Sequence, residues 1–297
     1  MFKDICSQLF IRDPDSQKYD YGNILIIAGS KGMAGAAVMS AKACLRSGAG
    51  LVTVSTPDEC CNTLQTLAPE AMVIGRGFDE LDKKIDKYTA IALGPGLGFN
   101  ESSIDLVEHI LLNTHQPLII DADGLNCLSI LAQDNQDPIY QDFIIKRKSP
   151  LILTPHTGEA KRLLSPWYTK SQFEELSRNK IIKEIETKYN AIVILKGHET
   201  LVSNSEVSDI TEDYYVNKTG NPGMAVGGSG DVLTGICLGI IGQAIKKEIS
   251  IEKATQLAVY LHGLAGDLAK EDYGETSLLV TDIITYLPQA IQKVIQI

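Results

Sequence analysis

The sequence predicts an α/β fold in which helices cover both faces of a central, mostly parallel sheet. Short apolar, β-branched runs recur along the chain, and each is followed by a glycine-rich or acidic turn and then by a longer segment of helical character. Most of these runs are continuously apolar rather than alternating, which indicates strands buried on both faces. With 297 residues and 44% hydrophobic content, the chain can bury one large core, so we expect a single domain over residues 1–297.

The elements follow from these patterns in chain order. The expected strands are residues 23–28, 51–55, 90–93, 117–121, 151–154 and 191–195, and the expected helices are residues 34–47, 101–113, 172–189, 231–244 and 251–270. Residues 278–295 contain Pro288, which predicts two short helices or one kinked helix. Alternating polarity over residues 200–216, around Ser203-Asn204-Ser205, predicts a hairpin-like edge of the sheet. Residues 1–20 are expected to form a partly ordered arm.

Composition excludes several classes of function. The net charge is −10, with 37 acidic against 27 basic residues, which disfavours binding to nucleic acid or to an anionic membrane. The longest weakly polar stretch, residues 232–242, is far shorter than the ~20 residues of a membrane span. The N-terminus does not resemble a secretory signal, so we expect a cytoplasmic protein. The six cysteines form no C-x-x-C motif, which argues against disulfides and a thiolate zinc site.

The sequence contains four glycine-rich turns. Three lie at the ends of expected strands, and the fourth precedes an expected helix. They are residues 29–35, 94–98, 121–124 and 227–231. The first two turns match neither G-x-G-x-x-G nor G-x-x-x-x-G-K-[ST], so a Rossmann fingerprint and a Walker A loop are both rejected. Any one of these turns alone is explained by tight backbone geometry. Ligands of open parallel sheets bind at the carboxyl ends of strands, so four such turns together favour a shared cleft.

The run Gly227-Gly228-Ser229-Gly230-Asp231 directly precedes an apolar helix. Glycines leave space for a phosphate, and a helix start offers free amide donors and the positive end of its dipole, which predicts an anion hole. Asp231 either caps the helix, a contribution of ~1 kcal/mol, or accepts the proton of a substrate hydroxyl. A carboxylate is repelled by a neighbouring phosphate, which favours the second role. We expect the helix dipole to keep Asp231 ionised at neutral pH.

Two further turns carry polar residues after a strand. Residues 196–200, Lys-Gly-His-Glu-Thr, fit either a nucleotide-binding loop or a plain surface turn. In residues 154–159, Thr157 and Ala160 do not form a capping box, so His156 and Glu159 are expected to be free for a ligand. No chemistry is assigned to the three remaining isolated histidines, which are His109, His115 and His262.

In this order, the motifs resemble those of the NAD(P)H-hydrate dehydratase family, the carbohydrate-kinase-like half of bifunctional nicotinamide-nucleotide repair enzymes. The most specific match is residues 217–231, NKTGNPGMAVGGSGD. Supporting matches are AGS with MAGAA at residues 28–37, LGPGLG at 93–98, TPHTGE at 154–159 and LKG at 195–197. The resemblance covers nearly the whole chain, from Tyr21 to Gly263.

The resemblance implies a ribokinase-like fold and dehydration of the S epimer of hydrated NADH or NADPH, driven by ADP or ATP. By motif, the hydrated nicotinamide nucleotide contacts Ala36, Gly96, Gly98, His156 and Asp231. The adenine nucleotide contacts Lys196, Gly197, His198, Glu199, Thr200 and Gly230, while the amides around Gly228, Ser229 and Gly230 hold the transferred phosphoryl group. Asp231 is the expected general base.

The resemblance also sets expectations for cofactors and partners. Mg²⁺ is expected to accompany the nucleotide, but no carboxylate cluster in the sequence identifies its ligands. The family is usually tetrameric, and the epimerase that converts the R epimer is expected as a separate or genetically linked protein. One departure is that Gln17-Lys18-Tyr19 stands where the family often has His-Lys-Gly, so any role of that histidine is absent.

Two other functions fit part of the pattern. A small-molecule kinase of the same superfamily also uses Gly-Ser-Gly-Asp, and it differs by leaving a stable phosphate ester. A nucleotide-sensing module without turnover needs the anion hole but not a base, so Asp231 argues against it.

Overall fold

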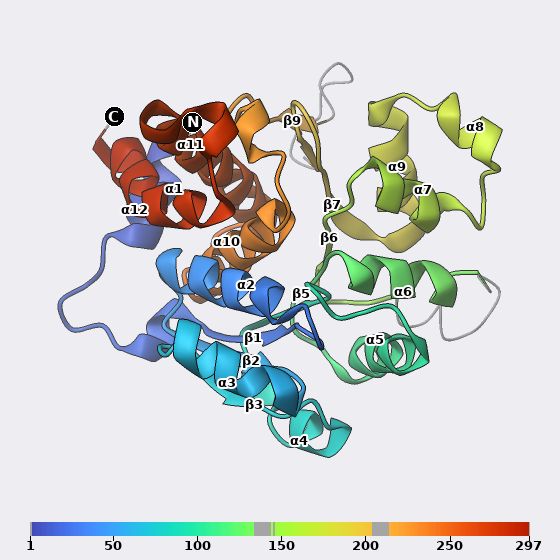
Figure 1. The fold of residues 1–297 in the computed structure, drawn as a ribbon, viewed down its shortest axis with the longest axis horizontal. Coiled ribbons are helices and arrows are strands. Elements are labelled where there is room, and N and C mark those ends of the chain that lie inside the picture. The colour runs from blue at the N-terminus through green and yellow to red at the C-terminus, as the bar shows by residue number, and fades with distance from the viewer. Residues whose placement is uncertain (1, 134–143, 145, 204–213, 297) are drawn as a thin grey trace.

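A twisted sheet runs through the centre of the molecule (Figure 1). The structure is a computed structural model that describes residues 2–133, 144, 146–203 and 214–296. Among these residues the sheet has nine strands in the order β3-β2-β1-β4-β5-β6-β7-β8-β9. Strands β1 to β7 pair in parallel and β8 pairs antiparallel with both neighbours, which confirms the predicted mostly parallel sheet. The strands are β1 (Asn23–Ile27), β2 (Leu51–Ser55), β3 (Met72–Ile74), β4 (Ala90–Leu93), β5 (Leu118–Ile120), β6 (Leu151–Leu153), β7 (Ala191–Leu195), β8 (Leu201–Ser203) and β9 (Tyr214–Val216).

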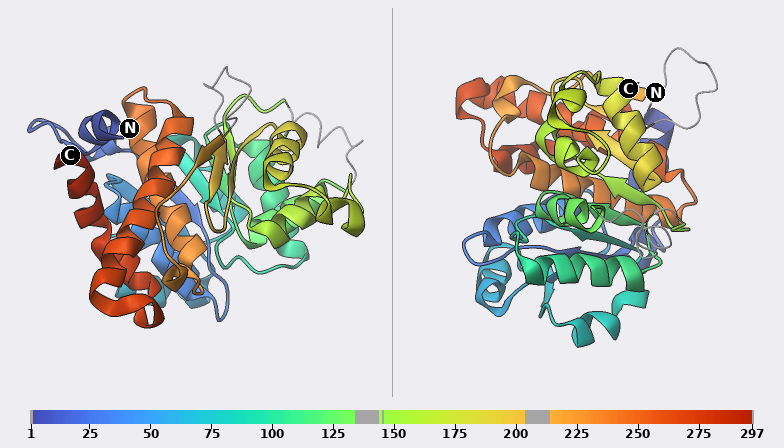
Figure 2. Two further views of the ribbon diagram at one scale, coloured as in Figure 1. Left: turned by 90° about the horizontal axis from the view of Figure 1, so that it is seen from above. Right: turned by 90° about the vertical axis from the view of Figure 1, so that its right-hand side faces the viewer.

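Helices cover both faces of this sheet, as Figure 2 shows from two further directions. In chain order they are α1 (Lys3–Phe10), α2 (Ala34–Arg46), α3 (Asp58–Leu67), α4 (Phe78–Asp82), α5 (Glu101–Asn113), α6 (Asp123–Leu131), α7 (Thr157–Leu164), α8 (Lys170–Glu174), α9 (Arg178–Tyr189), α10 (Ser229–Lys246), α11 (Ile251–Ser277) and α12 (Val280–Gln296). Short 3₁₀ helices are η1 (Lys18–Tyr21), η2 (Ile85–Lys87) and η4 (Pro222–Met224).

Strand β1 shows why its sequence is apolar throughout. Ile24 and Ile26 pack into one hydrophobic cluster with α2, α10, α11 and α12. Leu25 and Ile27 point the other way, into a second cluster with α5, α6, α7 and α9. Successive side chains of a strand point to opposite faces, so a strand covered on both sides is apolar at every position.

Helix α10 packs directly against the backbone of α2 at two glycines. A Cβ atom on Gly235 would lie 2.2 Å from the carbonyl oxygen of Ser40, and one on Gly239 would lie 2.6 Å from that of Cys44. The hydroxyl of Ser40 also donates a hydrogen bond to the backbone oxygen of Asp231 at 3.0 Å. These contacts fix the start of α10 relative to the sheet.

The chain reverses its direction of travel across the sheet between β1 and β4. From β1 it adds β2 and β3 on one side, then returns to place β4 on the other. The two loops beyond this switch point touch, since the amide of Gly29 donates to the carbonyl of Pro95 at 2.8 Å. Gly94 has φ +127°, and a Cβ atom there would lie 1.9 Å from the carbonyl oxygen of Asp121. In open α/β sheets such a switch point is where ligands bind.

Several elements differ from the sequence expectation. The helix expected over residues 172–189 is divided into α8 and α9, because Ser177 accepts a hydrogen bond from the amide of Lys180 and starts a new helix. The predicted pattern did not include α3, β3, α4 or α6. Residues 280–296 form one helix that contains Pro288. The edge pairing of β8 with β9 agrees with the predicted hairpin, although Asn204 and Ser205 lie outside the described residues.

The first residues form a packed helix rather than the expected arm. In α1, Cys6 and Leu9 are fully buried. The ring of Phe2 contacts those of Tyr215 and Tyr260, with centroids 5.6 and 5.2 Å apart. The two ends of the chain therefore lie side by side, with α1 against α12 (Figures 1 and 2).

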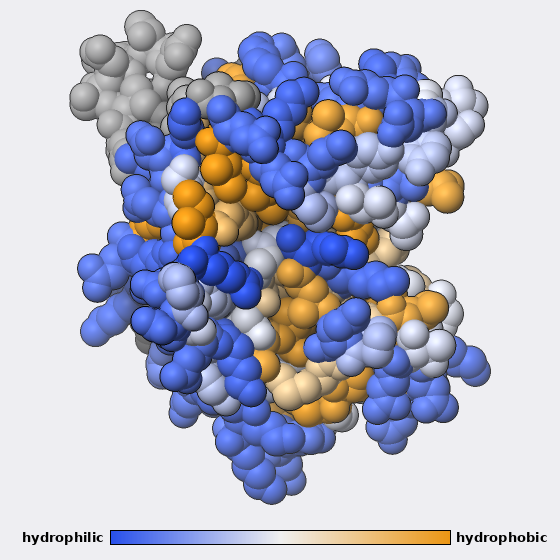
Figure 3. Space-filling model, turned by 90° about the vertical axis from the view of Figure 1, so that its left-hand side faces the viewer, coloured by the Kyte–Doolittle hydropathy of each residue, from blue (hydrophilic) through white to orange (hydrophobic). Residues whose placement is uncertain are grey.

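One face of the molecule is largely polar (Figure 3). Figure 3 shows one face on which polar side chains dominate and hydrophobic ones appear mainly toward the middle. Of the helices in the described ranges, none has the length and apolar character required to cross a membrane.

Candidate active site

The carboxyl ends of five neighbouring strands carry the segments that the sequence singled out. Strands β1, β4, β5, β6 and β7 are adjacent and parallel. The turns that follow them are residues 28–35, 94–98, 121–124, 154–159 and 196–200. Parallel strands end at the same edge of a sheet, so the structure brings these turns to one edge.

A cavity of about 520 Å³ lies between this edge and α10 and α11. Its walls come from four segments, namely the loop after β7, the loop between β9 and α10, the first turns of α10, and the middle of α11. The lining residues are Lys196, Gly197, His198, Glu199, Thr200, Asn217, Thr219, Gly220, Asn221, Pro222, Met224, Ala225, Ser229, Gly230, Leu233, Val259, His262 and Gly263. The predicted nucleotide contacts at 196–200, 229 and 230 thus share one cavity, while Gly228 lies just before it.

The start of α10 forms one end of this cavity. Gly228 is the N-cap residue, in the left-handed conformation with φ +93°. The first hydrogen bond of the helical pattern runs from the amide of Val232 to the carbonyl of Gly228 at 3.0 Å. The amides of Gly230 and Asp231 precede it, and such amides have no carbonyl partner within the helix. This geometry suits a phosphate group.

Asp231 does not act as the helix cap. No side-chain hydrogen bond caps α10 at its start. Burial raises the pKa of the Asp231 carboxyl to about 7, and the charge of Asp121 contributes in the same direction. The helix dipole therefore does not hold this pKa low, as the sequence led us to expect, because desolvation and neighbouring carboxylates outweigh the dipole. A carboxyl group with a pKa near 7 is well matched to general-base chemistry at neutral pH.

Asp121 and Lys196 form a buried ion pair behind the start of α10. Nζ of Lys196 lies 2.7 Å from Oδ1 of Asp121, and Oγ1 of Thr234 donates to Oδ2 of Asp121 at 2.8 Å. Burial by itself raises the pKa of Asp121, but Lys196 and the hydrogen bonds outweigh it and lower that pKa. The sequence marked residues 121–124 as a turn and assigned Asp121 no role. Its only signal was an acid directly after a buried strand.

The predicted substrate contacts on the first half of the sheet also come together. Ala36 lies in the first turn of α2, and its Cβ would be 2.8 Å from a Cβ atom placed on Gly96. Gly98 follows in the same turn, and its amide donates to Oδ2 of Asp123 at 2.9 Å. Gly96 and Gly98 have φ of +58° and +83°, a conformation that favours glycine. These residues form the side of the edge above β1 and β4.

His156 and Glu159 are not free, contrary to the sequence expectation. His156 is the N-cap of α7, and its Nδ1 accepts hydrogen bonds from the amides of Gly158 and Glu159 at 2.9 and 3.4 Å. Glu159 in turn accepts from the amide of His156 at 2.8 Å, which completes a capping box. The capping box begins at His156, one residue before the Thr157 that the sequence pattern suggested. Because Nδ1 accepts, the ring carries its proton on Nε2, which faces Oε1 of Glu159 at 3.4 Å.

His262 belongs to the cavity, although the sequence assigned it no chemistry. It lies on α11, and its Nε2 is 3.5 Å from Oγ of Ser229 at the start of α10. Burial lowers the pKa of His262 to about 4, against the opposing effect of the Ser229 backbone. The imidazole is therefore neutral at pH 7. Its partner lies 33 residues away in sequence, so local pattern could not find it.

The loop after β7 is held by contacts at its base and rim. Arg178 donates to the carbonyl oxygens of His198 and Leu195. The hydroxyl of Thr200 donates to the carbonyl of Gly197 at 2.9 Å. At the exposed rim, Glu199 forms an ion pair of 2.6 Å with Lys218 from the opposite wall. The loop is thus a fixed wall of the cavity rather than a plain surface turn.

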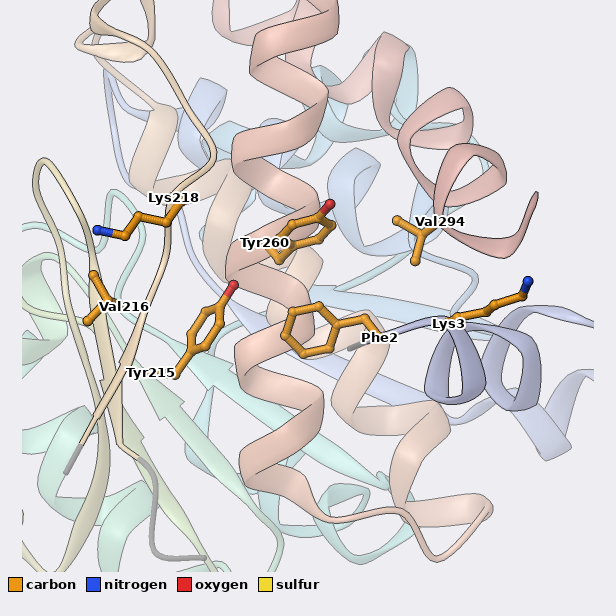
Figure 4. Close-up of a pocket in the computed structure, with 7 residues that line it drawn as sticks. All are labelled: Phe2, Lys3, Tyr215, Val216, Lys218, Tyr260 and Val294. Carbon is orange, nitrogen blue, oxygen red and sulfur yellow. The ribbon is translucent and has the colours of Figure 1, made fainter. Parts of the chain in front are cut away.

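A second cavity, of about 330 Å³, lies by the N-terminus (Figure 4). It is lined by Phe2, Lys3, Tyr215, Val216, Lys218, Tyr260 and Val294. This lining includes no carboxyl group and no histidine, and none of the predicted site residues. The predicted nucleotide-binding residues line the cavity at the start of α10 instead, and we assign the chemistry there.

Comparison with known proteins finds relatives along nearly the whole chain. A family model described as NAD(P)H-hydrate dehydratase matches residues 24–289. An ADP-dependent (S)-NAD(P)H-hydrate dehydratase from Listeria monocytogenes is 35% identical over 293 residues, covering 96% of this chain and 93% of that protein. A bifunctional NAD(P)H-hydrate repair enzyme from Moorella thermoacetica is 34% identical, covering 97% of this chain and 52% of the relative. The chain thus spans about half the length of the bifunctional relatives that it matches.

A solved structure extends the likeness to three dimensions. It is an ADP/ATP-dependent NAD(P)H-hydrate dehydratase from Bacillus subtilis, co-crystallised with ATP and Mg²⁺. It is 29% identical, with a TM-score of 0.80 over 99% of this chain and 97% of that chain. A ribokinase-like superfamily protein from Enterococcus faecalis is 31% identical, with a TM-score of 0.81 over 100% of this chain and 96% of that chain. This similarity confirms the ribokinase-like fold that the sequence resemblance implied.

Proposed function

Because this chain belongs to the NAD(P)H-hydrate dehydratase family, we propose that it dehydrates the S epimer of hydrated NADH or NADPH at the expense of ADP or ATP. One observation carries the proposal. Asp231, with a pKa of about 7, stands beside the free amides that close the end of the cavity. A base next to an anion hole is what transfer of a phosphoryl group to an alcohol requires.

In this proposal the adenine nucleotide occupies the cavity between the 196–200 loop and α11. Its terminal phosphate lies at the start of α10, where the amides of Gly230 and Asp231 hold it. The hydrated nicotinamide ring approaches from the side of Ala36, Gly96 and Gly98. The two ligands therefore meet at Asp231. Positioning and electrostatic stabilisation supply most of the rate in phosphoryl transfer.

The chemistry overcomes a poor leaving group. Hydration places a hydroxyl on carbon 6 of the reduced ring. Asp231 accepts the hydroxyl proton while the oxygen attacks the terminal phosphorus, and AMP leaves from ADP, or ADP from ATP. The ring nitrogen then donates its lone pair, the C6–O bond breaks, and inorganic phosphate departs. Loss of a proton from carbon 5 restores the ring double bond and thus NADH or NADPH.

Mg²⁺ is part of the proposal as the companion of the nucleotide. It neutralises phosphate charge when bound. Among residues 2–133, 144, 146–203 and 214–296, no three His, Cys, Asp or Glu side chains gather as a metal site. Mg²⁺ commonly binds through substrate phosphates, waters and one or two carboxylates, so the site fits an ion that arrives with the nucleotide. We propose no further ligand from the chain.

Three finer expectations remain predictions. They are the tetrameric assembly, the cytoplasmic location and a partner epimerase. The bifunctional relatives are about twice the length of this chain, which supports a second, linked activity. Without it, this chain is expected to leave the R epimer unconverted.

The test is to supply hydrated NADPH with ADP, and separately with ATP, and to follow the reduced-nicotinamide absorbance and inorganic phosphate. The proposal predicts that both rise together. A kinase of the same superfamily would instead leave a stable phosphate ester without restoring the chromophore. A folded sample that restores no absorbance with either nucleotide would remove the dehydratase function.

A further inference from the structure

Asp121 connects three parts of the active-site framework. It follows β5 and is 1% exposed. Oδ1 accepts a hydrogen bond from Lys196, which follows β7, at 2.7 Å. Oδ2 accepts one from Thr234, which lies one helical turn beyond Gly230 on α10, at 2.8 Å. Both carboxylate oxygens are thus occupied by groups that flank the proposed base.

Lys196 stands directly behind the start of α10. Its Nζ lies 3.2 Å from the position that a Cβ atom on Gly230 would take, and Oδ2 of Asp121 lies 3.6 Å from that position. The ammonium has a second, longer contact of 3.6 Å to Glu159. A buried ammonium needs a carboxylate partner. If Asp121 lost its charge, Lys196 would turn to the remaining acids, Glu159 and Asp231.

From this arrangement we propose that Asp121 is a positioning residue, which holds Lys196 behind Gly230 and keeps it from pairing with Asp231. Asp231 then remains free to accept the proton of the substrate hydroxyl. The inference deepens the proposed function and rests on Asp231 being the base. It assigns Lys196 a second task besides lining the nucleotide cavity.

The charges around Asp231 support this assignment. Burial raises the pKa of Asp231 most, and Asp121, Asp123 and Glu159 raise it further, whereas Lys196 lowers it. Neutralising Asp121 would remove one raising effect and release the lysine that lowers the pKa. Both changes act in the same direction, toward a weaker base.

The test is the pH profile of kcat for Asp121→Asn in the full chain, with hydrated NADPH and ADP. We expect the apparent pKa of the acidic limb to fall by at least one unit and the plateau rate to fall about 10-fold, since a weaker base transfers protons less readily. A merely structural role would lower the rate without moving the limb. Thr234→Val is the matched control: it removes a hydrogen bond to the same carboxylate but keeps its charge, so the limb should stay in place.

Two further measurements keep the inference falsifiable. Lys196→Met leaves the Asp121 charge without its partner. It should move the acidic limb of the kcat profile to higher pH, opposite to the shift expected for Asp121→Asn. This variant also tests the inference if Asp121→Asn does not fold. The titration of Asp231 can be followed without substrate by carbon-13 NMR of the labelled carboxyl group. An Asp231 pKa that is the same in wild type and Asp121→Asn overturns the inference. An inactive wild type in which the pKa still shifts would instead refute only the dehydratase function.

Discussion

Thr234, one helical turn after the proposed base, donates a hydrogen bond from its hydroxyl to the buried carboxylate of Asp121 at 2.8 Å. This bond joins the helix that presents Asp231 to the strand edge that anchors Lys196. The start of α10 is therefore held from both sides, because Ser40 of α2 also binds the backbone oxygen of Asp231. The base and the anion hole form one rigid unit.

The raised pKa of Asp231 predicts a pH-dependent rate. A general base must be deprotonated, so kcat should fall about tenfold per pH unit below an apparent pKa of about 7. Above that value the rate should be constant until another group titrates. The measurement is kcat from pH 5 to 9 with saturating nucleotide and hydrated NADPH. A flat profile between pH 5 and 8 would contradict the assignment.

The same pKa predicts how stability changes with pH. The Asp231 carboxyl titrates near pH 4 in the unfolded chain and at about 7 when folded. Between these values the folded state binds more protons, so its contribution to the free energy of unfolding is present below pH 4 and is lost as the pH rises through 7. Asp231→Asn should therefore be more stable than wild type at pH 8, by about 1 to 2 kcal/mol once partial exposure is allowed for. At pH 4 the two should differ little. Denaturant unfolding at both pH values measures this, and a variant less stable at pH 8 argues against the buried, raised-pKa carboxyl.

Glu199 offers a test of the nucleotide cavity. Its carboxylate pairs with Lys218 across the exposed rim, and exposed ion pairs contribute little to stability. Glu199→Gln should leave the unfolding midpoint unchanged. It should tighten ADP binding about two- to threefold at low salt, because Lys218 becomes available to the anionic nucleotide. The control is Glu174→Gln, which breaks the exposed pair with Lys161 away from the cavity. Equal ADP affinity of wild type and Glu199→Gln at low salt would place the nucleotide elsewhere.

The cysteines should behave as buried, reduced thiols. Cys6, Cys44, Cys60, Cys127 and Cys237 are buried and Cys61 is partly exposed. Burial raises the pKa of Cys61 as well, through desolvation and the nearby Asp58, so even this thiol should react slowly. We expect intact-mass analysis after treatment with a thiol-alkylating reagent under native conditions to show one label first, on Cys61. The mass of the untreated protein should show no loss of the two hydrogens that a disulfide removes. Rapid labelling of several thiols would mean that the cores described above open readily.

The sequence predicted those features that depend on local pattern. The continuously apolar strands and the apolar start of α10 can be predicted from their own residues, because burial on two faces dictates side-chain type at every position. The break at Ser177 was missed because helical periodicity on both sides masks a cap.

The chemistry of the site was harder to predict. The pKa of Asp231 depends on Asp121 and Lys196, which lie 110 and 35 residues away and meet it only in the folded sheet. The local sequence indicated only the helix dipole, which lowers this pKa, and gave no sign of the burial and neighbouring carboxylates that raise it. The place of His262 in the cavity could not be predicted for the same reason, because its partner Ser229 is distant in the sequence.

The most direct test of the account is Asp231→Asn, measured for turnover and for nucleotide affinity together. Asparagine keeps the size of the side chain but cannot accept the proton, so turnover should fall by ~100-fold or more while the Kd for adenine nucleotide stays within ~10-fold. Asp4→Asn, the same change in the first turn of α1, is the matched control and should be fully active. If Asp231→Asn restores NADPH from its hydrate at nearly the wild-type rate, Asp231 is not the base and the account is wrong.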